Sequence, residues 1–140
     1  MKKVDAHCHL ATALCPVENL KQAIQLGVEF SLQGGIDPKD WSSQLDLFSK
    51  FPKNIGLCFG VHPYFVAHHS AKECESALDQ LARFLPKAMA LGEIGLDFRS
   101  KYTNENLIES NGTFHPQAAG TMMDLKDHQW NFFEAQLEML

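Results

Sequence analysis

The segment His7-Cys8-His9 follows the apolar residues at the start of the chain and could bind a metal ion. Side chains alternate between the two faces of a β-strand, so His7 and His9 would point the same way, with their Cα atoms about 7 Å apart. That separation lets both rings reach one cation. Taken alone, the motif also fits two histidines that alternate by chance, so the rest of the chain must decide.

Two later apolar runs also end in residues that can do chemistry. Residues 55–61 lead into His62-Pro63, and residues 88–92 lead into Glu93. A carboxylate at the end of an apolar strand is costly to bury alone, and either a cation or a neighbouring basic side chain would offset that cost. We therefore predict Glu93 as a third metal ligand. His62 would contact substrate or would only shape its turn.

The elements that must position these residues are β-strands alternating with helices. Strands are predicted at 3–7, 28–33, 55–61 and 88–94, with a helix at 17–26. Asp37-Pro38 predicts the start of a second helix, and Ser70 with Glu73 forms a capping box before a third. This order of about four βα units predicts a parallel sheet, and in closed parallel barrels the active site lies at the carboxyl ends of the strands.

Three motifs, taken in order, resemble the TatD-type metal-dependent hydrolases, a family that includes deoxyribonucleases. The motifs are Asp5-Ala6-His7-Cys8-His9-Leu10, Gly60-Val61-His62-Pro63 and Gly92-Glu93-Ile94-Gly95-Leu96-Asp97-Phe98. A weaker match places Gln129, Phe133, Gln136 and Leu137 in the helix after the family's fourth strand. The resemblance covers nearly the whole chain.

This resemblance implies a (β/α)8 TIM-type barrel that hydrolyses phosphodiester bonds of DNA with a metal-activated water. It implies that His7 and His9 bind one divalent ion and that Glu93, the expected catalytic residue, bridges two, the ions being Mg, Mn or Zn. Family members take further ligands from later strands. This chain ends at Leu140, before those positions, so we expect a fragment of a longer protein or a shortened gene product.

Length supports an incomplete barrel, because a barrel of this type has about 250 residues, with roughly 200 as the lower limit, and this chain has 140. We expect residues 1–140 to form one domain, the N-terminal half of the barrel. Its first and last strands would be unpaired edges, which favour pairing with another chain. We therefore expect the isolated chain to be marginally stable, to form a homo-oligomer through these open sheet edges, or to depend on a missing half.

Composition indicates a soluble, cytoplasmic protein. Hydrophobic residues make up 45% of the chain and charged residues 21%, and no apolar run is long enough to span a membrane. The four cysteines lack the spacing of a metal site or a disulfide framework, so reduced thiols are expected, with Cys8 packed in the core. The net charge of -5 argues against broad phosphate neutralisation, but a metallonuclease can meet phosphate through its cations.

The long polar stretch from Arg99 to Lys126 is expected to be either a functional or a disordered loop, and at the catalytic face of a barrel it could form a lid. Arg99 could contact a phosphate oxygen, whereas His115 would be a poor substitute for a ligand held on a strand. His68 and His69 are expected in a solvated loop. Three functions stay open: an active DNA hydrolase, a catalytically silent metal-binding remnant, and another H-x-H barrel hydrolase acting on C–N bonds or small phosphate esters.

Overall fold

The computed structural model describes residues 3–98 and 122–140, and for residues 122–125 the backbone alone. Strands alternate with helices along this mixed α/β chain. The strands are β1 (Lys3–Cys8), β2 (Val28–Gln33), β3 (Ile55–Gly56), β4 (Cys58–Phe59) and β5 (Ala90–Leu91). The helices are α1 (Pro16–Gln25), α2 (Pro38–Lys50), α3 (Pro63–His68), α4 (Ala71–Phe84) and α6 (Met122–Leu137), with short 3-10 turns η1 (Leu10–Thr12) and η2 (Leu85–Lys87).

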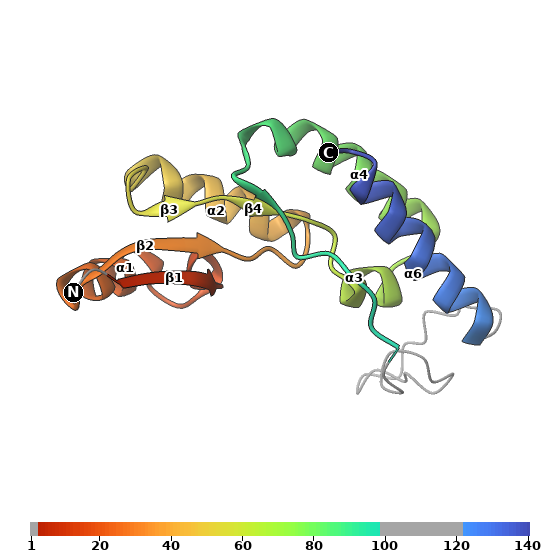
Figure 1. Cartoon of the computed structure of the whole chain (residues 1–140), viewed down its shortest axis with the longest axis horizontal. Helices are drawn as coiled ribbons and strands as arrows, with labels where there is room; N and C mark the ends of the chain where they lie inside the picture. Colours follow the sequence, from red (N-terminus) through yellow and green to blue (C-terminus); the bar gives the residue numbers. More distant parts are fainter. Residues whose placement is uncertain (1–2, 99–121) are drawn as a thin grey trace.

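All strand pairs of the described chain are parallel, as the sequence predicts. β1, β2 and β3 form one sheet in chain order, and β4 pairs with β5 in a second. Only Leu57 separates β3 from β4, and its carbonyl accepts hydrogen bonds from the N–H groups of Met89 and Ala90. The strands therefore follow one another in space as they do in the chain, and they run in one direction (Figure 1).

The third and fourth predicted strands are shorter than expected. The run 55–61 is broken at Leu57 and ends at Phe59, and of residues 88–94 only Ala90 and Leu91 are strand. Past these strand ends the backbone groups form hydrogen bonds outside the sheets. For example, the Glu93 N–H donates to the Gly35 carbonyl at 3.3 Å. The strands end because loops and side chains, rather than a neighbouring strand, satisfy the next peptide groups.

Two helix starts agree with the sequence. The Asp37 carboxylate accepts the Lys39 N–H at 2.7 Å and caps α2. Ser70 and Glu73 form a complete capping box at the start of α4. Each arrangement satisfies amide groups that the first turn of a helix leaves without partners.

Helix α3 corrects the prediction that His68 and His69 lie in a solvated loop. His68 ends the helix and His69 caps it. The Nδ1 atoms of both rings bond carbonyl oxygens four residues earlier, and the rings stack on Tyr64 and Phe65. The two rings therefore provide hydrogen-bond partners for carbonyl groups at the end of α3, which the helix itself leaves without partners.

The core lies between the sheet and the helices. Trp41 is fully buried and lies near the rings of Phe59 and Phe84, with centroid separations of 5.5 to 6.0 Å. Four glutamines are also buried in this interior: Gln33, Gln44, Gln129 and Gln136. Within residues 3–98 and 122–140, no helix is long and apolar enough to cross a membrane.

Candidate metal centre

His7, His9 and Glu93 converge at one end of the sheet. His7 lies near the end of β1, His9 just past it, and Glu93 two residues after β5. The Nε2 atoms of His7 and His9 lie 3.7 and 3.3 Å from Glu93 Oε1, and one candidate ligand atom from each residue lies within 4.8 Å of the other two. The parallel order of the strands brings Glu93 next to two histidines that lie more than 80 residues earlier in the sequence. Their role as metal ligands stays a prediction.

The hydrogen bonding of His9 leaves its Nε2 free to act as a ligand. His9 Nδ1 lies 3.1 Å from the Gly34 carbonyl oxygen. Because a carbonyl can only accept, Nδ1 must carry the hydrogen, and in the neutral ring Nε2 then has a lone pair. Proteins usually orient a metal-binding histidine in this way, with a hydrogen-bond acceptor bonded to the ring nitrogen that does not bind the metal.

Glu93 Oε1 is buried and has no hydrogen-bond partner among the described residues. In the neutral state of His9, a lone pair on nitrogen faces a carboxylate oxygen at 3.3 Å, and the two atoms repel unless a cation or a proton lies between them. Two ligands at about 2.1 Å from one ion lie about 3.0 to 3.4 Å apart for bond angles between 90° and the tetrahedral value. The 3.3 Å between His9 Nε2 and Glu93 Oε1 falls in this range, and the 3.7 Å between His7 Nε2 and Glu93 Oε1 corresponds to a wider bond angle of about 120°. Two imidazoles and a carboxylate are a donor set that divalent cations take in proteins, so the residues present fit such an ion.

His62 lies beside this group but has the opposite arrangement of its ring nitrogens. Its Nδ1 accepts the Tyr64 N–H at 2.9 Å and so caps α3. The ring must then be neutral with the hydrogen on Nε2, which lies 3.9 Å from Glu93 Oε2. That separation is too long for a hydrogen bond between these two atoms. His62 thus offers a donor at the site rather than a ligand.

Gly34 forms a wall of the centre that sequence reasoning missed. It follows β2, and its N–H donates to the Cys8 carbonyl at 2.8 Å. A Cβ atom added at Gly34 would lie 2.7 Å from Glu93 Oε1, 2.9 Å from His7 Cε1 and 3.2 Å from His9 Cε1. The available signal was the pair Gly34-Gly35 at the end of a predicted strand, where glycine often marks a close approach.

The two cysteines near the centre are kept as neutral thiols. Burial raises the pKa of the Cys8 thiol, and its sulfur accepts a hydrogen bond from Gln33 Nε2. Burial, followed by the negative charge of Glu93, raises the pKa of Cys58 to about 11, and its thiol donates to the Gly92 carbonyl. Both thiols are therefore protonated near neutral pH in the metal-free chain.

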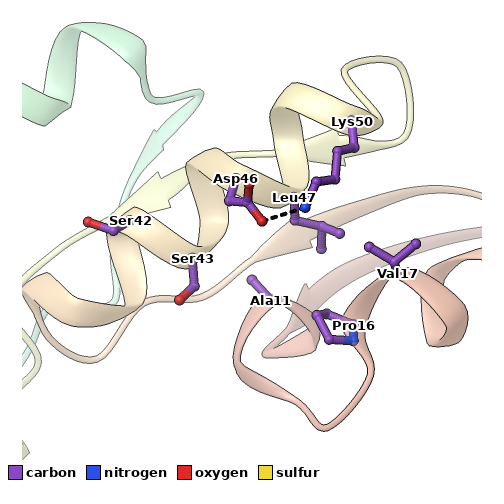
Figure 2. Close-up of a pocket in the computed structure, with 8 residues that line it drawn as sticks. All are labelled: Ala11, Pro16, Val17, Ser42, Ser43, Asp46, Leu47 and Lys50. Atoms are coloured by element: carbon purple, nitrogen blue, oxygen red, sulfur yellow. Dashed lines mark hydrogen bonds and ion pairs between the residues drawn. The ribbon is translucent and has the colours of Figure 1, made fainter.

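Two sequence predictions lie outside the described residues: a phosphate contact by Arg99 and a substitute ligand at His115. Residues 99–121 of the predicted lid lie outside them too, but its last residues, 122–126, form the start of α6 and not a loop. A separate pocket lies on the helix side of the sheet (Figure 2), and none of His7, His9, His62 and Glu93 lines it. It is lined by Ala11, Pro16, Val17, Ser42, Ser43, Asp46, Leu47 and Lys50. An ion pair between Asp46 and Lys50 crosses its rim.

Comparisons with known proteins agree with this architecture. A family model described as TatD related DNase matches residues 4–139. Among solved structures, an uncharacterized amidohydrolase from Saccharomyces cerevisiae is similar, with a TM-score of 0.66 and 21% identity over 99% of this chain. The match spans 44% of the yeast chain, so this chain covers less than half of that protein's length. A comparison with curated proteins found no match.

Proposed function

The chain belongs to the TatD-related DNase family, and from this premise we propose that it is a metal-dependent hydrolase acting on phosphodiester bonds of DNA. One observation carries the proposal: the buried Glu93 Oε1 has no hydrogen-bond partner among the described residues and faces His9 Nε2 at 3.3 Å. A cation between these atoms accounts for both facts. Mg, Mn and Zn are the ions proposed, one or two per site.

His7, His9 and Glu93 are the residues that would hold the cation. A bound divalent ion supplies an activated water and stabilises negative charge on phosphoryl oxygens. Gly34 fixes the His9 ring through its carbonyl and leaves room beside Glu93. The side chain of Glu93 is 27% exposed and that of His7 is 56% exposed, so a substrate phosphate can approach from the open side.

His62 would bind the substrate. Its Nε2–H is directed into the site by the bond that its Nδ1 accepts from Tyr64 N–H. A neutral N–H donor suits a phosphate oxygen next to a cation, because it adds a hydrogen bond without competing for the metal. Arg99 is proposed as a second phosphate contact on the sequence motif alone.

Replacing His62 by Ser is expected to lower kcat/KM for a phosphodiester about ten- to a hundredfold, which corresponds to one hydrogen bond to a charged group. Metal affinity would stay unchanged. Serine can still cap α3, so the helix persists. Steady-state kinetics with bis(p-nitrophenyl) phosphate, beside a Co²⁺ titration, separate the two effects. A loss of metal affinity equal to the loss of activity would instead make His62 a ligand.

The fold and assembly are proposed as follows. The parallel strands in chain order support one domain that is half of a (β/α)8 barrel. Among the described strands β1 pairs only with β2, and Val4 in β1 and Met89 just before β5 are 68% and 65% exposed. Open edges next to exposed apolar side chains support self-association of the chain or pairing with a remaining half. Four free cysteines support a reducing compartment, the cytoplasm.

The function is tested with the purified 140-residue chain, a single-stranded DNA oligonucleotide and bis(p-nitrophenyl) phosphate, with Mg²⁺, Mn²⁺, Zn²⁺ or EDTA. Cleavage that needs a metal and stops in EDTA would support the hydrolase. Metal binding without turnover of either substrate would favour the catalytically silent remnant, an outcome consistent with the 44% coverage of the yeast protein. Cleavage of amides or small phosphate monoesters in preference to DNA would overturn the nuclease assignment.

A further inference from the structure

Gln136 of α6 makes two hydrogen bonds to Val61, which lies two residues past the end of β4, and a third to the Phe132 carbonyl within α6. Its Oε1 accepts the Val61 N–H at 2.6 Å, and its Nε2 donates to the Val61 carbonyl at 3.1 Å. Gln136 and Val61 are each 1% exposed. Val61 immediately precedes His62, so this contact fixes the peptide from which His62 extends.

Gln129 repeats this arrangement on the segment that follows Glu93. Its Oε1 accepts the Asp97 N–H at 2.8 Å, and its Nε2 donates to the Asp97 carbonyl at 3.1 Å. The Glu93 N–H is bonded to the Gly35 carbonyl, so residues 93–97 are held at both ends. Gln129 and Gln136 are seven residues apart, two turns of α6, and therefore lie on one face of the helix.

A primary amide suits this task because it presents a donor and an acceptor, as a peptide group does. Past the ends of β4 and β5, no strand within residues 3–98 and 122–140 lies beside the backbone to complete a ladder, yet its buried N–H and C=O groups need partners. Two bonds to one residue also fix its orientation. By comparison, the one bond that the buried Gln44 side chain makes within the described part of the chain is to the Cys58 N–H in β4.

We propose that Gln129 and Gln136 are positioning residues, through which α6 sets the places of Glu93 and His62 respectively. The proposal rests on the proposed metal-dependent function. The two glutamines act on different parts of the centre. Gln129 affects metal affinity because it holds the segment that carries Glu93, and Gln136 affects the hydrogen-bond donor for the substrate because it holds the residue before His62. Loss of Gln129 should therefore affect metal binding, and loss of Gln136 should affect His62. If the two glutamines only filled the core, their loss would change neither property, or would change both properties in the same way.

The test uses Gln129→Met and Gln136→Met, which keep side-chain length and remove the side-chain hydrogen bonds, beside Gln44→Met as a buried control. Co²⁺ affinity is measured by visible absorption. The tautomer of His62 is measured from its imidazole ¹⁵N shifts in the metal-free chain. We expect Gln129→Met to weaken Co²⁺ binding about tenfold, the low end for residues outside the ligand shell, with His62 unchanged. Gln136→Met is expected to mix the tautomers of His62 while Co²⁺ affinity stays unchanged.

Equal changes in both variants, or none in either, would overturn the proposal. Changes of the same size in Gln44→Met would do so too. If one variant fails to fold, the other decides through its own readout. Unfolding of both beside a folded Gln44→Met would assign the two glutamines to stability alone. If the wild-type chain binds no Co²⁺, the proposed function fails, and the His62 tautomer in Gln136→Met still decides whether α6 positions that residue.

Discussion

Replacing Glu93 by Gln is expected to weaken binding of divalent metal by at least about a hundredfold, since residues outside a ligand shell already contribute about ten- to a hundredfold. Hydrolysis should fall below detection with it. The substitution removes the negative charge of the group and gives one of its two oxygen positions to an NH₂ group. A Co²⁺ titration and phosphodiester turnover on the same sample measure the two effects.

The metal-free fold should tolerate Glu93→Gln or gain stability. Oε1 is buried, has no hydrogen-bond partner in the described part of the chain and faces His9 Nε2, and the new amide can donate to that nitrogen. Removing an unsatisfied buried charge is favourable, so the melting temperature without metal should not fall. Glu134→Gln, the same change at an exposed position of α6, is the control. Wild-type Co²⁺ affinity in Glu93→Gln would show that this carboxylate is not a ligand.

The convergence of His7, His9 and Glu93 could be predicted because it depends on few facts. Each residue lies near or just past the carboxyl end of a predicted strand, parallel strands place their carboxyl ends at one edge, and chain order then brings these strand ends together. The difference between His9 and His62 could not be predicted. His9 is bonded to the Gly34 carbonyl and His62 to the Tyr64 N–H. Every residue has such backbone groups, so the amino-acid sequence does not indicate which of them a histidine will bond.

Features of the fold that depend on neighbouring residues could be predicted from the sequence, whereas features that depend on distant residues could not. Helix starts at Asp37 and Ser70 follow from short side chains that bond their own first turn, so local sequence was sufficient. The ends of β4 and β5 depend on partners far along the chain: Gln136 bonds Val61, which is 75 residues earlier. Helix α3 was missed because its cap is a histidine, outside the residue types that usually begin helices.

Replacing Gly34 by Ala is expected to weaken metal binding about tenfold or more although it removes no ligand. The added methyl group would lie 2.7 Å from Glu93 Oε1 and 2.9 Å from His7 Cε1, closer than packed atoms allow. Both neighbours are ends of side chains, so they can turn away, and the backbone of Gly34 is outside the left-handed region. The fold should therefore persist while the ligands separate.

The matched control is Gly56→Ala, in β3. Its methyl group would lie 2.6 Å from Phe30 Cζ and 2.9 Å from Leu32 Cδ1, so overpacking should cost about 1–3 kcal/mol of unfolding free energy and leave Co²⁺ affinity unchanged. Gly34→Ala should show the reverse pattern, with binding lost and stability kept. Both variants add one methyl group. Loss of Co²⁺ affinity only in Gly34→Ala and loss of stability only in Gly56→Ala would therefore show that the methyl group at Gly34 disturbs the metal ligands and not the fold. Wild-type Co²⁺ affinity in Gly34→Ala would mean that His7, His9 and Glu93 do not hold one ion in the arrangement described.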